Sequence, residues 1–370
     1  MRFMEGIQNP VAKRIAQWAF RLVKIGAAGA VAVVILSVLM LGYSFIPVHI
    51  ENPVSNTDYI WPAGSVWFRV TEGIGYGKFD NNGFNNPEVI EHPDILLLGS
   101  SHMEAQYVPQ SDSVSAVMND LFAGEHEVYN LGISGHTIYK TCQYLPKNIE
   151  LYRDSVKYVI LETFFVSLTQ EDVDNVLNHT VQYASSKHNP VMQFVNEVPG
   201  LRIMDHQRKV GFFDLFKDSG SRPNVFSIDG DEYSSEVSAS DLPAYDRLFQ
   251  YLEDIEKDTG VELIIYYHPT ETFDDEGHIL FEEGNAYEAF AAAAEAHNID
   301  FVDVADDFTK MFYEDHHVAH GFCTGKLGMG HLNSYGHRAS AEALVRFIRE
   351  KDRAQEPAQQ EKEADAHVND

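Results

Sequence analysis

The sequence has few cysteines and few basic residues. Only Cys142 and Cys323 occur among 370 residues, which excludes a small disulfide-stapled scaffold. Lys and Arg number 27 against 56 Asp and Glu, so the formal net charge is −29. A surface of that sign repels phosphate backbones and anionic lipid surfaces, and nucleic acid is therefore not an expected partner. Solubility or a salty habitat would explain the same charge.

Long apolar runs are absent except for one near the amino terminus. Residues 25–47 contain no charged side chain, whereas residues 1–24 carry five basic residues and a single acidic one, Glu5. The apolar stretch is long enough to cross about 30 Å of hydrocarbon at about 1.5 Å per residue. We expect an uncleaved anchor over 25–47, with 1–24 in the cytoplasm and the rest of the chain outside. A cleavable signal peptide is the alternative, disfavoured by the length of the run and by its Tyr-Ser-Phe-Ile-Pro exit.

The predicted extracytoplasmic location bears on the two cysteines. An oxidising compartment would allow Cys142 and Cys323 to form one disulfide. Two separate buried thiols are the alternative, because isolated cysteines are often small buried apolar residues.

Beyond residue 91 the chain alternates between short apolar runs and helical patterns. Strands are expected at 94–98, 127–132, 157–162, 262–269 and 300–304, and helices at 112–122, 137–152, 242–257, 285–297 and 338–351. This alternation predicts an α/β fold in three layers, with a central parallel sheet and right-handed crossovers.

Four further segments complete the predicted organisation. Residues 48–91 form an entry segment whose aromatic residues should pack on the main domain, which spans 92–351. Within that domain, 164–240 loses the α/β rhythm and is expected to be an insertion that shapes a cleft. The polar tail 352–370 lacks apolar residues and is expected to be disordered.

The first strand of the domain ends in Gly99-Ser100-Ser101-His102. Strand-to-helix turns lie at the carboxyl edge of a parallel sheet, where α/β proteins build their sites. A hydroxyl at such a turn is a good nucleophile position, beside backbone N–H groups of the next helix. Capping of that helix by Ser100 and Ser101 is the alternative.

Two later loops belong to the same edge of the sheet. His331 precedes the last helix and can face Ser101 as the base that takes its proton. Gly132 follows the second strand, and its N–H with that of Ser101 can hold the oxyanion of a tetrahedral intermediate.

These three loops resemble the motif blocks of the SGNH/GDSL hydrolase superfamily. Ile-Leu-Leu-Leu-Gly-Ser-Ser-His is similar to the first block, with Ser101 at its nucleophile. Asn130-Leu-Gly-Ile-Ser-Gly135 is similar to the second, with Gly132 at the oxyanion position, and His331-Leu-Asn-Ser-Tyr-Gly-His337 to the last, with His331 at the catalytic histidine. The resemblance implies a three-layer, flavodoxin-like SGNH fold after one transmembrane helix, and a serine esterase or acyltransferase without cofactors.

The chain departs from the family pattern at two positions. Gly328 stands where the family has Asp, three residues before the histidine, and Glu162-Thr-Phe-Phe165 stands where the third block has Asn. A backbone carbonyl, or an acid such as Asp303, Asp306 or Glu162, remains open as the group that orients His331. Loss of both family residues also leaves open a catalytically degenerate domain that binds glycan or scaffolds an envelope assembly.

A second cluster of polar residues, Glu314-Asp-His-His-Val-Ala-His320, suggests a metal site at His316, His317 and His320. No matching ligand motif accompanies it, so we expect no metal and assign this run to the wall of the cleft. His102 and Glu104 are expected to have solvated or structural roles, and His337 is expected to pack or cap at the start of the last helix. Together with the expected anchor, the resemblance to the superfamily implies hydrolysis or transfer of ester groups, acetyl above all, on envelope or exported polysaccharide.

Overall fold

The computed structural model describes residues 9–40, 46–47, 50, 60–70, 72–178, 198, 201, 235–281, 284–322, 328 and 330–368. The chain divides into two compact units, one of Met1–Phe45 with Ser186–Val225 and the other of Ile46–Ser185 with Phe226–Asp370. Most of the predicted insertion 164–240 and Cys323, with its predicted disulfide alternative, lie outside the described residues. Cys142 is fully buried, and burial raises the pKa of its thiol to about 12.

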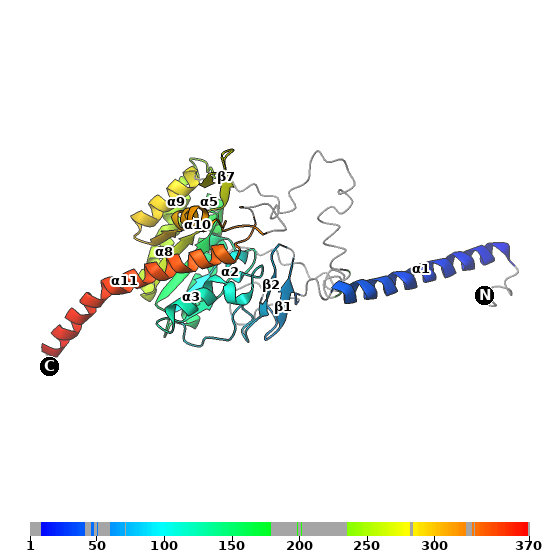
Figure 1. Cartoon of the computed structure of the whole chain (residues 1–370), viewed down its shortest axis with the longest axis horizontal. Helices are drawn as coiled ribbons and strands as arrows, with labels where there is room; N and C mark the ends of the chain where they lie inside the picture. Colours follow the sequence, from blue (N-terminus) through cyan, green and yellow to red (C-terminus); the bar gives the residue numbers. More distant parts are fainter. Residues whose placement is uncertain are drawn as a thin grey trace. The chain divides into compact units, whose positions relative to one another are not determined.

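The first unit contains the helix α1, and the other helices and strands whose bounds follow lie in the second (Figure 1). The strands are β1 (Val66–Arg69), β2 (Gly75–Lys78), β3 (Ile95–Leu98), β4 (Val128–Asn130), β5 (Tyr158–Thr163), β6 (Glu262–Tyr267), β7 (Glu271–Phe273), β8 (Ile279–Phe281) and β9 (Asp300–Asp303). The helices are α1 (Pro10–Met40), α2 (Ser101–Glu104), the 3₁₀ helix η2 (Gln110–Asp112), α3 (Val114–Phe122), α4 (Ile138–Leu151), α5 (Gln170–Leu177), α8 (Leu242–Thr259), α9 (Asn285–Ala296), α10 (Ala305–Asp315) and α11 (Ser334–Val368).

Five parallel strands form the central sheet in the order β4-β3-β5-β6-β9. The order reverses beside β3, which is the flavodoxin-like arrangement and places a crevice at the carboxyl end of that strand. The predicted α/β fold with its parallel sheet is confirmed. All four residues of β3 are buried, because helices cover the sheet on both faces.

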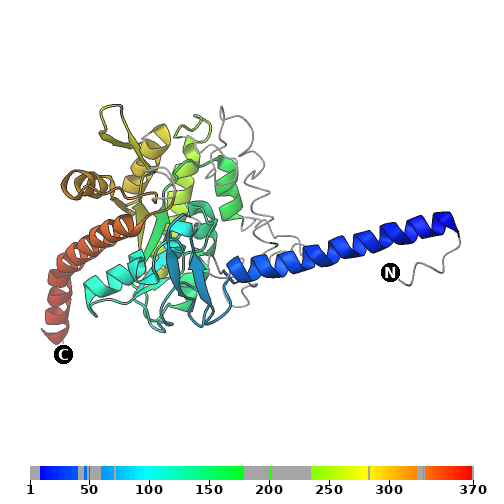
Figure 2. The same cartoon turned by 45° about the vertical axis from the view of Figure 1, so that its right-hand side comes forward.

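The two faces of the sheet have separate apolar cores. Leu96 and Leu98 of β3 face the layer of α4, α5, α8 and α9, while Ile95 and Leu97 face that of α3, α10 and α11. The alternation follows from the two-residue period of a strand, which sends successive side chains to opposite faces. Figure 2 shows the two helix layers from a second direction.

The entry segment packs against the main domain through a small aromatic cluster. The rings of Trp61 and Phe79 stack with centroids 4.9 Å apart, and Trp67 lies against Phe79. Trp61 Nε1 also donates to Glu104 Oε1 at 2.6 Å, which joins the segment to α2. This attachment fixes the antiparallel pair β1–β2 and the turn between its strands.

One described helix, α1, is long and apolar enough to cross a membrane, with a candidate span of Pro10–Ser37. It begins before the predicted start at residue 25, so Lys13 and Arg21 belong to the same helix as the apolar run. The direction of insertion and the location of the second unit stay predictions.

The carboxyl-terminal helix differs from its predicted extent. α11 continues to Val368, so the tail 352–370 expected to be disordered is helical through that residue. The run is rich in Ala, Gln, Glu and Lys, which favour helix by intrinsic propensity even without an apolar face. The start of this tail segment is attached to β5 and the residue before it through Asp352, which accepts from Lys157 Nζ at 2.5 Å and from Tyr158 Oη at 2.6 Å.

Candidate active site

The two serines of the turn after β3 have different roles. Ser100 is the N-cap of α2, since its Oγ accepts the N–H of His102 at 3.2 Å. Ser101 is the first residue of the helix, and its Oγ lies 2.8 Å from His331 Nε2. The capping interpretation therefore applies to Ser100, and Ser101 has a base as its partner.

Glu72 completes this pair from the turn between β1 and β2. Both of its carboxylate oxygens lie 3.0 Å from His331 Nδ1, and Oε2 also accepts the backbone N–H of His331 at 3.1 Å. With the carboxylate on Nδ1, the proton of the neutral ring sits there, and Nε2 presents a lone pair to Ser101. Ser101, His331 and Glu72 thus have the geometry of a nucleophile, a base and an orienting acid.

Sequence analysis did not identify Glu72 as a site residue. Glu72 takes the role of the acid that the family pattern has at the position of Gly328. Gly328 has φ +75°, and a Cβ there would lie 2.7 Å from the backbone oxygen of Glu271. An aspartate at this position would be strained, so the acid comes from another segment of the chain. Glu162 instead binds Ser100, and Asp303 binds Tyr287 at 2.5 Å.

The electrostatic state of Glu72 suits this position. Burial raises the pKa of its carboxyl, but the hydrogen bond and charge of His331, with Arg69 nearby, outweigh burial and hold the pKa below its usual value. Glu72 is therefore a carboxylate at neutral pH and can stabilise an imidazolium at His331.

An aromatic face fixes the plane of the histidine. The Tyr107 ring stacks on His331 with centroids 3.9 Å apart and an interplanar angle of 22°. The Arg69 guanidinium lies 4.5 Å from the centroid of the same tyrosine ring. Both Arg69 and Glu72 belong to the entry segment, which therefore builds part of the site in addition to packing on the domain.

Gly132 is adjacent to the nucleophile turn, but its N–H already has an acceptor. It donates to Asn130 Oδ1 at 2.8 Å, while Asn130 Nδ2 donates to Met103 O at 2.7 Å. A Cβ on Gly132 would lie 2.6 Å from Glu104 N, so close packing against α2 explains this glycine. In this structure the Gly132 N–H is engaged within the turn, and Ser101 N–H is the donor left from the predicted oxyanion pair.

His102 and Glu104 are buried beside the nucleophile, so a structural role fits them and a solvated one does not. Burial and the neighbouring histidines hold the pKa of His102 well below its usual range, which keeps the ring neutral. Burial raises the pKa of Glu104, which accepts from Trp61 and Ser134. His337 is likewise buried within α11, and burial lowers its pKa to about 3.

The histidine run near residue 316 does not form one cluster. His316 ends α10 with φ +60°, and His317 stacks on Tyr335 with centroids 3.5 Å apart. His320 is fully buried and bonds Glu271 Oε2 at 2.6 Å. The run therefore supplies one inward-facing histidine, and two that lie elsewhere.

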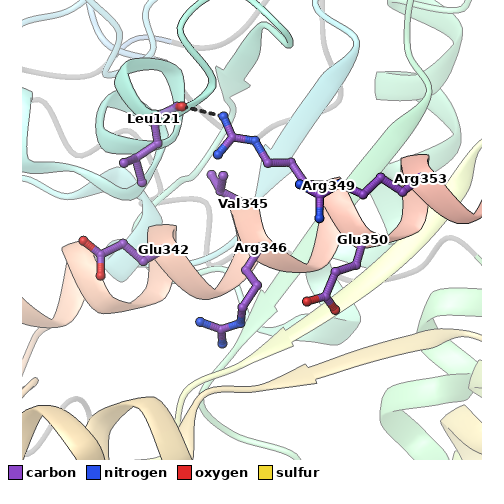
Figure 3. Close-up of a pocket in the computed structure, with 7 residues that line it drawn as sticks. All are labelled: Leu121, Glu342, Val345, Arg346, Arg349, Glu350 and Arg353. Carbon is purple, nitrogen blue, oxygen red and sulfur yellow. Dashed lines mark hydrogen bonds between the residues drawn. The ribbon is translucent and has the colours of Figure 1, made fainter.

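A cavity of about 300 Å³ between α3 and α11 is not part of this site (Figure 3). It is lined by arginines and glutamates of α11 with Leu121. Arg346 and Arg349 are paired with Asp307 and Glu125, so their charges are balanced locally. A smaller cavity of about 10 Å³ borders Ser100, Glu162 and Phe164, next to the nucleophile turn.

No protein-family model and no curated protein sequence matches the chain. Solved structures that resemble it include the acetyl xylan esterase AlAXEase, with 13% identity, a TM-score of 0.38, and 69% of this chain and 98% of that one covered. A lipolytic protein of the G-D-S-L family from Veillonella parvula has 14% identity and a TM-score of 0.34, covering 68% and 96%. The acetylxylan esterase Axe2 from Geobacillus stearothermophilus, as a catalytic mutant, has 15% identity and a TM-score of 0.36, covering 70% and 94%.

Proposed function

We propose that the protein is a membrane-anchored, SGNH-like serine esterase or O-acyltransferase. The observation that carries the proposal is the chain of contacts from Ser101 Oγ to His331 Nε2, and from His331 Nδ1 to the Glu72 carboxylate. A hydroxyl becomes a nucleophile when such a base takes its proton, and an ionised acid then stabilises the charged ring.

In the proposed reaction, Ser101 Oγ attacks the carbonyl carbon of an ester while His331 Nε2 accepts the hydroxyl proton. The tetrahedral intermediate collapses, the C–O bond of the ester breaks, and His331 returns the proton to the departing alcohol. Water or an acceptor hydroxyl then attacks the acyl-Ser101 intermediate, again with His331 as base. Glu72 stays ionised throughout and holds the ring in position.

We assign part of the oxyanion stabilisation to the backbone N–H of Ser101. It belongs to the first residue of α2, and N–H groups in the first turn of a helix have no acceptor within that helix. Such a donor is already oriented before charge develops on the substrate oxygen, so it costs no reorganisation. The Gly132 N–H would join it only by leaving Asn130 Oδ1.

One feature supports a substrate in the cell envelope or among exported polysaccharides. The apolar helix α1 supports anchoring to a membrane through a single span, with the catalytic unit outside the cytoplasm. Hydrolysis and acyl transfer share the acyl-enzyme, and differ in whether water or a sugar hydroxyl resolves it.

The test uses the full-length protein in detergent with an activated acetyl ester and a serine-directed phosphonate probe. Wild type should turn over the ester and gain one phosphonyl adduct, which peptide mass mapping places on Ser101. Ser101→Ala and His331→Ala should lose turnover by about 10³-fold or more. His278→Ala, an exposed histidine paired with Asp274, is the matched control and should keep full activity.

Turnover that survives Ser101→Ala would refute the assigned nucleophile. Absence of both turnover and adduct in wild type would favour the catalytically degenerate alternative, a domain that binds glycan without acting on it. Addition of an oligosaccharide acceptor then separates the two enzymatic outcomes, since a transferase forms acetylated sugar at the expense of free acetate.

A further inference from the structure

A second set of histidines and carboxylates lies behind the nucleophile turn, and the proposed reaction does not use it. His268 Nδ1 lies 3.2 Å from His320 Nε2. The outer nitrogens of the same rings contact carboxylates, His268 Nε2 at 2.7 Å from Glu162 and His320 Nδ1 at 2.6 Å from Glu271. All four side chains have no exposed surface. We call this set the buried histidine cluster.

The hydrogen bonds of the two carboxylates fix the protons of the cluster. Glu162 accepts the Ser100 N–H at 2.6 Å, and Glu271 accepts the Ala319 N–H at 2.5 Å, so both side chains act as acceptors. With both carboxyl groups ionised, the outer nitrogens of His268 and His320 are the donors, because a carboxylate has no hydrogen to give. The inner nitrogens of the two neutral rings therefore face each other with lone pairs.

Two lone pairs 3.2 Å apart need a positive group between them. A shared proton would leave two carboxylates and one imidazolium, a net charge of −1 without solvent. A divalent cation would balance the two carboxylates fully, and burying uncompensated charge is costly.

The distances suit a metal ion bound by imidazole. Two nitrogens at 2.0–2.1 Å from a tetrahedral zinc lie about 3.3 Å apart, close to the observed separation. Histidines that bind metals commonly donate their other N–H to a carboxylate, as both rings do here. One nitrogen of His102 lies within 4.8 Å of those of His268 and His320, which gives a third donor.

We propose that His268 Nδ1 and His320 Nε2, with His102 as the third nitrogen donor, bind a divalent transition-metal ion of the zinc class. His102 Nδ1 accepts the Leu332 N–H at 3.2 Å. To bind the ion, His102 must therefore either offer Nε2 in its deprotonated form or give up the hydrogen bond from Leu332. The ion replaces the proton between the two inner nitrogens. It holds His268, and through it Glu162, which accepts the Ser100 N–H beside the nucleophile. The role is structural and independent of ester chemistry at Ser101.

The test measures metal directly on the full-length protein in detergent. Protein stripped with a chelator and reloaded with zinc chloride is desalted, and its zinc content is determined by mass spectrometry of the element. Wild type and Ser101→Ala should each retain one zinc ion per chain, and His268→Gln and His320→Gln should retain none. Retention by Ser101→Ala separates this proposal from the proposed function, because that variant lacks the nucleophile.

Two matched controls exclude surface binding. His317→Gln removes a half-buried histidine close to His320 in the sequence, and His278→Gln removes the histidine of a solvent-facing group with Asp274 and Glu276. Both variants should retain one zinc ion per chain, as wild type does. Loss of zinc from either variant would overturn the assignment.

The buried variants can fail to fold, so wild-type protein loaded with cobalt provides a second measurement. Tetrahedral coordination by nitrogen gives visible d–d absorption, which zinc should displace. Wild type that retains no zinc and shows no such absorption would overturn the proposal, and a proton shared by His268 and His320 would take its place. Equal retention of zinc by wild type and folded His268→Gln would overturn it as well.

Discussion

Two hydrogen-bonded chains of histidine and carboxylate contact the nucleophile turn, one at Ser101 and one at Ser100, and they differ in where they end. The first runs from Glu72 through His331 to the hydroxyl of Ser101, and its histidine and carboxylate are 9% and 12% exposed. The second joins Glu162, His268, His320 and Glu271, all without exposed surface. The same residue types thus build one chain that ends at the half-buried hydroxyl of Ser101 and one that is fully enclosed.

The difference shows that a histidine–carboxylate contact does not define a catalytic group by itself. His331 has a nucleophile on its second nitrogen, whereas His268 and His320 have each other. The first arrangement can pass a proton to and from a reacting atom. The second has no reacting atom among its contacts, and we propose above that it binds a metal ion.

The largest effect is expected from breaking the first chain at its acid. Glu72→Gln keeps the size of the side chain but removes the charge that orients and stabilises His331. We expect kcat/KM for an acetyl ester to fall by about 10³ to 10⁴-fold, as for other triads that lose the acid. Glu72→Asp, which keeps the charge at a shorter reach, should lose less. Activity of Glu72→Gln within threefold of wild type would contradict the assigned role.

The next effect is expected from breaking the second chain. Glu271→Gln removes one carboxylate from a buried pair, so unfolding free energy should fall by about 3–5 kcal/mol. Denaturant titration followed by tryptophan fluorescence measures this change. Asp307→Asn, in the partly exposed pair with Arg346, is the control and should cost far less. Equal losses in the two variants would contradict the contrast between buried and exposed pairs.

A smaller effect is expected from removing the aromatic support of the first chain. Tyr107→Leu deletes the ring that stacks on His331, an interaction worth about 0.5–1.5 kcal/mol. We expect kcat to fall by about three- to tenfold with little change in melting temperature. Tyr107→Phe keeps the ring and should stay close to wild type, and a loss in it equal to that of the leucine variant would point to the hydroxyl.

The smallest effect is expected in the dependence of the melting temperature on pH in acid. The pKa of Glu72 is lowered from 4.5 by its contacts with His331, so this carboxyl stabilises the fold above that value. The stabilisation is lost as pH falls below 4.5 through the lower pKa of the folded state. The melting temperature of Glu72→Gln should therefore fall less steeply than that of wild type in this range. Parallel curves would show that Glu72 titrates normally.

The sheet and the nucleophile turn followed from local patterns. Apolar runs with the right spacing predicted all five strands of the central sheet, and the Gly-Ser-Ser turn after the first run pointed to Ser101. His331 was predicted because it precedes the last helix, at the edge where Ser101 also lies. Such features depend on neighbouring residues, and neighbours in sequence are visible without the fold.

Glu72 was missed because nothing near it in the sequence marks it as a site residue. It lies 259 positions from His331, in a turn of the entry segment, outside the α/β rhythm. The position of the family aspartate gave no help, since Gly328 has a backbone that disfavours any side chain. His268 had a weak signal, because it directly follows β6 at the same edge of the sheet.

By itself, the sequence determined the α/β fold, the apolar amino-terminal helix and the pairing of Ser101 with His331, because periodicity and turn chemistry act over short distances. Only the tertiary structure decided which carboxylate orients His331, that the Gly132 N–H is engaged, and that His320 turns inward to His268. Those contacts join segments far apart in the chain, and their partners are chosen by packing, which no local pattern encodes.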